Sequence, residues 1–295
     1  MFKLKPRLFI SIRGNKRPAG GGANTFAWNM ARFLKKYKLQ FTSNIKKASY
    51  AIVIADKVDL RDLKFANSRG CFILHRLDEE FEPNLLKPKH RKIIEINKHV
   101  NVTIFQSEFV FKNVQPYLNA RKWEIVLNGA DPDIFCYNSN QGGYIGHISN
   151  SIGQKKRFDL LDRTITNYPQ ESFLLVGNHG KHKSIDFLRH KNVTLVGSVK
   201  KTVLSKYHKK MKCLYFPSER DPCPNTVVEA ILSGIPVCYN AYGGTKEVVK
   251  DCGLPLEQFD ELLDKLPTFH EKCRNRKDLF FDAVAEKYLN MMGFV

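Results

Sequence analysis

Residues 213–249 read CLYFPSERDPCPNTVVEAILSGIPVCYNAYGGTKEVV, a pattern typical of two strand–loop–helix units in succession. The apolar run 213–216 stops at a Pro-Ser turn and indicates a buried strand. A polar loop then leads into a helix with an apolar stripe, which ends at Gly234 before a second apolar run at 235–239. The glycines at 243–244 open the next helix. Strands joined in this way form a parallel α/β sheet, and ligands bind at the carboxyl ends of its strands.

The helix expected after the first loop has a start that suits an anion. We expect Asn225 or Thr226 to cap this helix, and the free N–H groups of a helix start bind phosphate. Glu229 lies one turn inside, where a carboxylate can accept hydrogen bonds from a ribose diol. Asp221, eight residues earlier, can reach the hydroxyls of a sugar beyond the phosphates. A structural interpretation stays open, in which Glu229 complements the helix dipole and Asp221 caps a turn.

The spacing Asp221-x7-Glu229, followed by GGTKEV, resembles the signature of family 4 glycosyltransferases, which have the GT-B fold. The family usually has glutamate at the first position, so Asp221 is a departure that keeps the charge on a shorter side chain. The resemblance implies an α/β protein with two Rossmann-like domains that face each other across a central cleft. It implies that Glu229 holds the donor ribose and that Asp221 is a catalytic residue on the donor sugar. The donor-binding residues at the helix start are then Pro224, Asn225 and Thr226.

A glycine-rich loop near the amino end, residues 13–22, lies between an apolar strand at 8–12 and a helix with an apolar face. Glycines let the backbone approach a ligand closely, although glycine loops of this kind are common. Beside the later motif, the loop resembles the N-terminal glycine loop of the same family. That resemblance implies that Gly21 and Gly22 contact the donor.

His75 follows the apolar run 71–74, and we expect it at the carboxyl end of a strand. The resemblance implies a catalytic role for His75, because a histidine after this strand in the family contacts the donor sugar near the transferred carbon. A histidine that only bonds a neighbouring loop is the structural alternative. Arg76 and Asp78 are further candidates for the same edge.

Basic residues mark the phosphate site expected in the second domain. Lys156 and Arg157 come just before a predicted helix that starts at Phe158. Cations at a helix start are unfavourable unless an anion binds there; a solvated helix start is the alternative. The resemblance implies that Lys156 is catalytic, binding the donor diphosphate, and that Arg157 supports it. His147 stands where the family usually has an arginine, a departure that affects one phosphate contact.

Two later loops follow the apolar runs 173–176 and 193–196. In the family such loops line the pocket for the nucleotide base through backbone groups. The resemblance therefore implies that Gly177, Ser198 and Val199 bind the donor.

The polar, glycine-rich stretch 136–143 is the expected linker. It separates a first domain at 1–138 from a donor domain at 139–277, and the resemblance implies that the final helix, within 278–295, packs back on the first domain.

The Asp-Pro-Asp triplet at 131–133 could be read as a metal-binding Asp-x-Asp, but it stands in a match to the family's Asn-Gly-x-Asp motif and no other ligand cluster accompanies it. We therefore expect no metal and no cofactor beyond the donor substrate.

Composition bounds the class of protein. A chain of 295 residues with 43% hydrophobic residues can fold into two domains of ordinary size. Seven scattered cysteines without metal-ligand spacing indicate buried thiols in a reducing compartment. No apolar run approaches the ~20 residues that span a bilayer, and the amino end shows no cleavage site of a signal peptide. A cytoplasmic protein is the expectation.

The net charge of +19 indicates either an anionic partner or a solvated basic surface. Nucleic acid, an anionic membrane or a polyanionic glycan would each attract such a chain. The basic residues are spread along the chain without one dominant block, which favours a solvated surface for most of them. Nucleic acid is the less favoured partner, and peripheral contact with an anionic membrane stays open.

Residues and resemblance together predict a retaining, metal-independent hexosyltransferase. It would move a hexose from a nucleoside-diphosphate sugar to an acceptor hydroxyl on a glycan, glycoprotein or lipid. GDP-mannose is the first choice of donor and UDP-glucose the second, both from family frequency. A nucleotide-sugar 2-epimerase of the same fold is an alternative, and so is a non-catalytic protein that binds nucleotide sugars or polyanions.

Overall fold

The computed structural model describes residues 6–12, 21–34, 39–82, 85–139, 142–182 and 184–294. Contacts divide the chain into two units. Unit 1 comprises residues 1–128 and 281–295, and unit 2 comprises residues 129–280. The sequence places the corresponding divisions at 138/139 and 277/278.

The segment 129–139 belongs to unit 2 because its backbone is bonded there. The N–H of Ala130 donates to the carbonyl of Leu279 at 3.0 Å, and the N–H of Asn138 donates to the carbonyl of Ser233 at 3.3 Å. Composition alone does not show such bonds, since their partners lie far along the chain.

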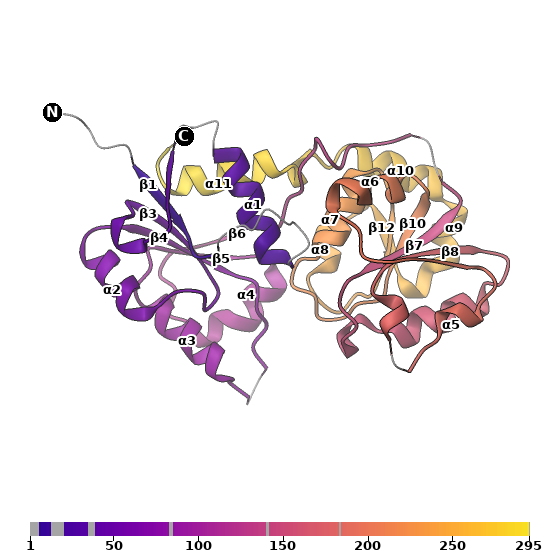
Figure 1. The fold of residues 1–295 in the computed structure, drawn as a ribbon, viewed down its shortest axis with the longest axis horizontal. Coiled ribbons are helices and arrows are strands. Elements are labelled where there is room, and N and C mark those ends of the chain that lie inside the picture. The colour runs from indigo at the N-terminus through magenta and orange to yellow at the C-terminus, as the bar shows by residue number, and fades with distance from the viewer. Residues whose placement is uncertain are drawn as a thin grey trace. The chain divides into compact units, whose positions relative to one another are not determined.

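Unit 1 contains a sheet of six strands in the order β2-β1-β3-β4-β5-β6 (Figure 1). Every pairing in it is parallel; β3 and β4, for example, align Ala51 with Ile73. Helices cover both faces of such sheets, so the central strands read as continuous apolar runs. The strands are β1 (Arg7–Ile10), β2 (Gln40–Thr42), β3 (Tyr50–Ile54), β4 (Phe72–Leu77), β5 (Val102–Phe105) and β6 (Trp123–Ile125).

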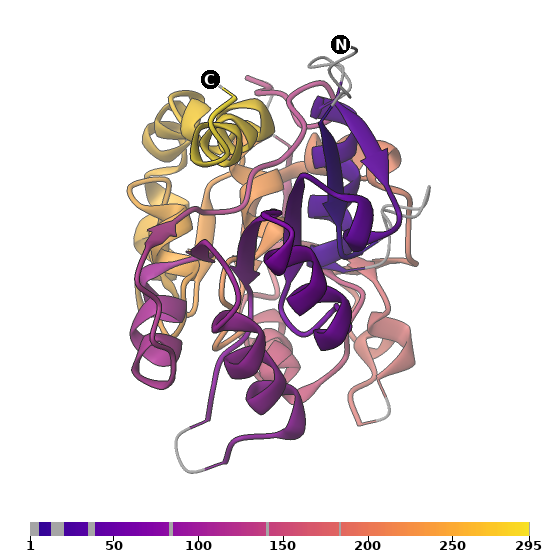
Figure 2. The same cartoon turned by 90° about the vertical axis from the view of Figure 1, so that its left-hand side faces the viewer.

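Helices lie on both faces of this sheet (Figures 1 and 2). Side chains alternate along β3, because successive strand residues point to opposite faces. Ile52 and Ile54 join the apolar cluster that contains α1 and α11, whereas Ala51 and Val53 join the cluster that contains α2. The helices are α1 (Gly22–Leu34), α2 (Leu60–Ser68), α3 (Pro88–Asn97), α4 (Glu108–Val114) and α11 (Phe281–Met291).

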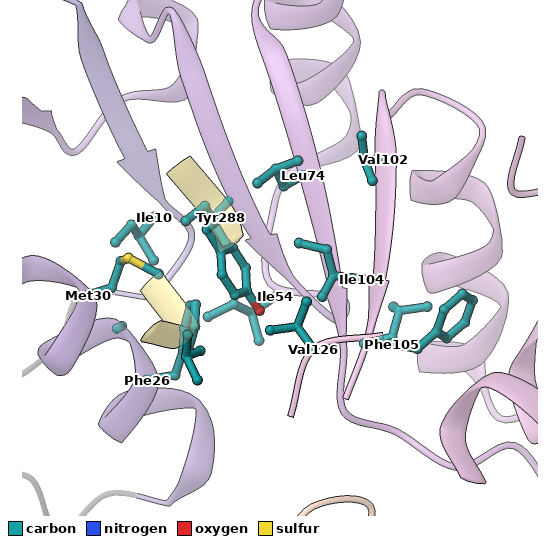
Figure 3. Packing of buried hydrophobic residues seen from close by; sticks show 14 of the residues in the cluster. Ile10, Phe26, Met30, Ile54, Leu74, Val102, Ile104, Phe105, Val126 and Tyr288 are labelled. Carbon is teal, nitrogen blue, oxygen red and sulfur yellow. The ribbon is translucent and has the colours of Figure 1, made fainter. Parts of the chain in front are cut away.

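The last helix, α11, completes the core of unit 1. Tyr288 is buried, and its ring packs against Phe26 of α1 with 5.1 Å between the ring centroids. Figure 3 shows Tyr288 among Ile10, Met30 and Ile54. The final helix of the chain therefore lies in the same core as its first strand.

Replacing Tyr288 by alanine should lower the free energy of unfolding by ~3–5 kcal/mol, the usual loss when a large buried ring leaves a cavity. Lys287→Ala, at an exposed position of the same helix, is the matched control and should stay within ~0.5 kcal/mol of the parent. Urea unfolding followed by circular dichroism measures both variants. Similar losses in the two would contradict the buried position of Tyr288.

Unit 2 contains a second sheet of six strands, in the order β12-β11-β10-β7-β8-β9. All its pairings are parallel as well. The parallel α/β class predicted from the sequence is therefore confirmed in both units. The strands are β7 (Tyr144–Ser149), β8 (Ser172–Gly177), β9 (Val193–Val196), β10 (Met211–Phe216), β11 (Val237–Tyr239) and β12 (Gly253–Pro255).

The helices of unit 2 follow its strands, as the parallel sheet requires. They are α5 (Phe158–Asn167), α6 (Lys201–His208), α7 (Asn225–Leu232), α8 (Thr245–Val249), α9 (Phe259–Asp264) and α10 (Leu266–Arg274). The seven cysteines of the chain are free thiols, and all except Cys136 are buried. In the described part of the chain, no helix has both the length and the apolar character needed to cross a membrane.

Candidate active site

Three loops come together at the carboxyl edge of the sheet in unit 2. Strand β10 lies between β7 and β11, so the loops that follow these strands are neighbours. The first loop carries Lys156 and the second carries Asp221. Lys156 Nζ lies 3.3 Å from Asp221 Oδ2 and 5.7 Å from the ring centroid of Phe216. Lys156 and Asp221, two residues predicted for the site and 65 positions apart, are thus in contact.

Both members of this pair remain accessible. The side chains of Lys156 and Asp221 are 24% and 21% exposed. A partly exposed ion pair of this kind contributes only ~0–1 kcal/mol to folding. The structure therefore keeps the two charges at the sheet edge at little gain in stability, and both can still meet a ligand.

Arg157 joins the same edge through an unusual backbone conformation. It has φ 49° and ψ 49°, and its guanidinium bonds Asp159 at 2.9 Å and Glu219 at 3.1 Å. These hydrogen bonds, with Asp159 the larger contributor, raise the pKa of Arg157 above its ordinary value. The N–H of Glu219 also donates to the carbonyl of Lys155 at 2.9 Å, which ties the first loop to the second.

The third loop fits against Asp221 because residue 243 is glycine. Gly243 has φ +136°, and a Cβ there would lie 3.0 Å from the backbone N and O of Asp221. The N–H of Gly244 donates to the Asp221 carbonyl at 2.9 Å, and the N–H of Arg220 donates to the carbonyl of Tyr242 at 2.7 Å. The backbone around Asp221 is held by the neighbouring loop, which fixes the starting point of its carboxylate.

Helix α7 begins at Asn225, but the side-chain cap predicted for it is wrong. The N-cap residue is Pro224, which has no side-chain acceptor, and Asn225 and Thr226 lie in the first turn. Both are half-buried. The helix thus starts without a side-chain acceptor from its cap residue, and an anionic ligand can serve its first N–H groups.

Two buried hydroxyls flank the Asp221 loop. Ser218 follows β10 and Thr245 begins α8, and their side chains are 1% and 0% exposed. Among the described residues, neither hydroxyl oxygen has a hydrogen-bond partner. Buried polar atoms without partners are uncommon in native proteins. The sequence offers no signal that distinguishes these two hydroxyls from the many others in the chain.

Glu229 lies buried in α7 and forms an ion pair with Lys201, the first residue of α6. Glu229 is 2% exposed, and the Lys201 side chain is 16% exposed. Burying a carboxylate is costly unless a charged partner stands beside it, as Lys201 does here. The sequence prediction did not include Lys201, although the signal existed: a lysine at a helix start is unfavourable unless a negative charge stands there.

The loops after β7, β8 and β9 are joined to one another. Gly177 has φ +121°, and a Cβ there would lie 2.0 Å from the carbonyl oxygen of Ser149. The hydroxyl of Ser198 donates to the side-chain oxygen of Asn150, and Val199 follows half-buried. The three residues predicted to line a base pocket therefore lie on the same sheet edge as the Lys156 loop.

His147 stands inside β7 and not at its end. Its Nδ1 lies 2.6 Å from Nε2 of His179, and both rings are buried. Burial, reinforced by the charges of His179 and Lys156, lowers the pKa of His147 well below its ordinary value. The imidazole is neutral at pH 7 and does not take over a phosphate contact from the family's arginine.

His75 does not stand at the carboxyl end of its strand, as the sequence predicts, because β4 continues to Leu77. The ring is fully buried, with Nε2 at 2.9 Å from the carbonyl oxygen of Ala55 and Nδ1 at 3.0 Å from the side-chain nitrogen of Asn97. Burial lowers the pKa of His75 to about 4. This is the geometry of the structural alternative: a neutral histidine bonded inside unit 1.

Arg76 and Asp78 lie closer than His75 to the carboxyl end of β4. The buried guanidinium of Arg76 lies over the ring of Phe26, 4.3 Å from its centroid, and donates to Asn128 at 2.8 Å and to Asp78 at 3.3 Å. Asp78 follows the last residue of β4, and its side chain is 22% exposed. Burial raises the pKa of Asp78, and the charge of Arg76 opposes that rise.

The predicted glycine loop is described only at its end. Gly21 has φ +89° and Gly22 is the first residue of α1, and both are exposed. Residues 13–20 of the loop lie outside the described residues.

In the described ranges no group of three or more His, Cys, Asp or Glu side chains is arranged to hold a metal ion. In the triplet at 131–133 the carboxylate of Asp131 accepts from the N–H of Asp133 at 3.0 Å, as in a capped turn.

Part of the chain matches a known protein family. Residues 140–269 match the family model described as "Glycosyl transferases group 1". That range holds all the donor-side residues discussed above for unit 2. No curated protein matches the chain by sequence.

Solved structures resemble the whole chain. HepE from Anabaena, solved in complex with UDP, has a TM-score of 0.75 at 14% identity, covering 98% of this chain and 100% of its own. Sucrose-phosphate synthase from Thermosynechococcus elongatus has a TM-score of 0.77 at 14% identity, with 98% of each chain covered. An S. aureus TarM variant, solved with Fondaparinux, alpha-GlcNAc-glycerol and UDP, has a TM-score of 0.62 at 19% identity, covering 91% of this chain and 59% of its own. Residues 140–269 are thus similar to group 1 glycosyltransferases, and the whole chain has the GT-B fold of the glycosyltransferase structures that it matches.

Proposed function

We propose that the chain transfers a hexose from a nucleoside-diphosphate sugar to an acceptor hydroxyl, with retention at the anomeric carbon. The observation that carries the proposal is the contact of Lys156 with Asp221, 3.3 Å at the carboxyl edge of unit 2. It joins the cation assigned to the leaving diphosphate to the carboxylate assigned to the sugar. A retained anomeric carbon follows from the family resemblance and is part of the proposal.

The diphosphate would meet positive charge from three directions. Lys156 and Arg157 stand on the loop after β7, and the uncapped start of α7 presents its first N–H groups. Asp221 and Glu219 form ion pairs with these two cations. Charge that grows on the leaving phosphate is stabilised best by groups already in place. Because these groups supply that charge, we propose that transfer needs no metal.

The nucleoside would lie beyond the phosphates. Glu229 is the proposed acceptor of the ribose hydroxyls, and Lys201 is the ion-pair partner of its carboxylate. Backbone groups around Gly177, Ser198 and Val199 would line the base. This arrangement follows the order of the loops along the sheet edge, from the centre at β10 outward to β9.

The donor remains a choice between bases. Family frequency favours GDP-mannose over UDP-glucose, whereas UDP is present in the similar structures of HepE and TarM. We propose UDP-hexoses as the first donors to test, and GDP-mannose as the second. Asp78 is the first carboxylate after β4, and its side chain is 22% exposed. We propose Asp78 in place of His75 as the polar group of unit 1 that contacts a substrate hydroxyl.

Asp221→Ala should narrow the gap in affinity between the sugar nucleotide and the bare nucleoside diphosphate. The carboxylate is assigned to neutral sugar hydroxyls, so binding of bare UDP should stay within about twofold of wild type. Loss of hydrogen bonds from a charged group should weaken the sugar nucleotide by about tenfold or more. Titration calorimetry with both ligands measures the gap. An unchanged gap would remove Asp221 from the sugar site, and Asp186→Ala, at an exposed position of unit 2, is the control.

A further inference from the structure

Unit 1 contains a cavity at the amino ends of its strands, on the opposite edge of the sheet from Asp78. Its volume is about 730 Å³, within the range of small-molecule pockets. Its lining residues come from the first positions of β1, β3 and β4, from residues 46–49, from residues 69–71 after α2, and from Met292 after α11. Strand β4 has six residues, so ~17 Å separates this cavity from the carboxyl edge at ~3.3 Å a residue.

The lining of this cavity carries positive charge only. Arg7, Lys46, Lys47 and Arg69 line it, and no acidic residue is among its lining residues. Lys46 forms an ion pair at 2.8 Å with Asp62, which is not one of the lining residues. Within the described ranges, Arg7, Lys47 and Arg69 form no ion pair with a carboxylate. A concave surface of one sign concentrates the field and attracts the opposite charge.

The same cavity has an apolar side. Tyr50, Phe72 and Met292 line it together with the cations. The rings of Tyr50 and Phe72 pack with centroids 6.4 Å apart, and Phe294 packs on Tyr50 at 4.6 Å. These rings are partly buried and pack against the core of unit 1. The cavity thus offers cations and an apolar surface within one space, and suits a ligand with an anionic group on a less polar body.

We propose that this cavity binds a phosphate ester, with the phosphate held by Arg7, Lys47 and Arg69 and the attached group on the surface of Tyr50 and Phe72. Two guanidinium groups favour phosphate, since each can donate two parallel hydrogen bonds to its oxygens. The volume exceeds what a bare phosphate fills, so an ester with a body is favoured over the free ion. A soluble phosphate ester and a phospholipid headgroup offer the same chemistry.

Glycerol 3-phosphate, titrated into the full chain by calorimetry, is the test. Lys47→Gln/Arg69→Gln should weaken its binding by about tenfold or more, because charge-assisted hydrogen bonds are lost. Arg121→Gln/Lys122→Gln removes the same two charges from exposed positions of unit 1 before β6 and should stay within about twofold. Lys156→Gln should also leave this binding unchanged, which separates the cavity from the proposed donor site. Unchanged thermal midpoints show that the variants fold.

Sedimentation with phosphatidylglycerol vesicles, and with phosphatidylcholine vesicles as the control, identifies the source of the phosphate. The cavity is assigned to a lipid headgroup if wild type binds the vesicles, Lys47→Gln/Arg69→Gln abolishes this binding, and glycerol 3-phosphate competes with the vesicles. Binding of glycerol 3-phosphate without vesicle binding assigns it to a soluble ester. The proposal is overturned if wild type shows no saturable binding of either probe, or if the Arg121/Lys122 variant loses as much affinity as the cavity variant.

Discussion

Replacing Lys156 by alanine should lower the turnover of sugar transfer by ~10²–10³-fold, the usual loss when one group that stabilises an oxyanion is removed. Donor affinity should fall much less. Lys156 is assigned to charge that grows on the leaving phosphate as the sugar bond breaks, so its contribution is larger in the transition state than in the bound donor. Steady-state rates beside titration calorimetry of the donor measure the two effects.

Lys155→Ala is the matched control for this variant. Lys155 is exposed beside Lys156, whereas the Lys156 ammonium lies 3.3 Å from Asp221. The control should keep turnover within about threefold of wild type, because an exposed charge beside the site is screened by solvent. If Lys156→Ala changes turnover no more than affinity, the assignment to the leaving group is wrong. Lys156→Ala should change the stability of the fold little, since the ion pair of Lys156 with Asp221 is partly exposed.

Glu229→Gln should weaken binding of both nucleoside diphosphate and sugar nucleotide by ~10–100-fold, because hydrogen bonds to a charged group are worth ~1.5–3 kcal/mol each. The loss should be the same for the two ligands, since ribose is common to both. The buried ion pair with Lys201 makes glutamine a better choice than alanine. Calorimetry with UDP and with a UDP-hexose measures the effect.

The ion pair adds a second consequence, which needs its own control. Removing one partner of a buried pair can cost up to ~3–5 kcal/mol of stability. Glu229→Gln/Lys201→Met removes the unpaired ammonium, so it should recover most of the thermal midpoint without recovering nucleotide affinity. Glu261→Gln, in an exposed pair with Lys265 at 2.8 Å, is the control for charge removal. Wild-type affinity in Glu229→Gln would refute the ribose assignment.

The stretch 213–249 shows why much of the fold can be predicted. Apolar runs stop at proline, glycine and polar residues, and these local signals mark β10, α7 and β11 to within a few residues. The helix start shows the limit of such signals. Asn225 and Thr226 are good capping residues, yet Pro224 takes the cap position because its φ of −71° suits the entry to the helix.

The site was harder to predict where contacts join distant segments. The family resemblance indicated Lys156 and Asp221 as separate candidates, and their contact follows from β7 and β10 being neighbours in the sheet. The pairing of Glu229 with Lys201 joins residues 28 positions apart in the chain. A lysine at a helix start indicates that a negative charge stands near it, but not that this charge is Glu229. Contacts of this kind depend on the order of the strands, which the sequence alone does not show.

His75 illustrates the opposite error. A polar pair after an apolar run indicates the end of a strand, but His75 and Arg76 continue β4 into the core. They can do so because Asn97 and Asn128, far along the chain, supply hydrogen-bond partners on opposite faces of the sheet. A buried polar group costs little when it is fully bonded, so polarity alone does not end a strand.

Release of nucleoside diphosphate from sugar nucleotides by the wild-type chain tests the central claim most directly. The chain would be incubated with UDP-hexoses and GDP-mannose in excess chelator, with and without a mixture of glycan and lipid acceptors, and the sugar product would be analysed by NMR. The account predicts that nucleoside diphosphate is released from one of these donors and that the chelator does not stop this release. Lys156→Ala should almost abolish the release. The product should keep the anomeric configuration of the donor. An inverted product, a free sugar epimerised at C2, or no release with any donor would contradict it.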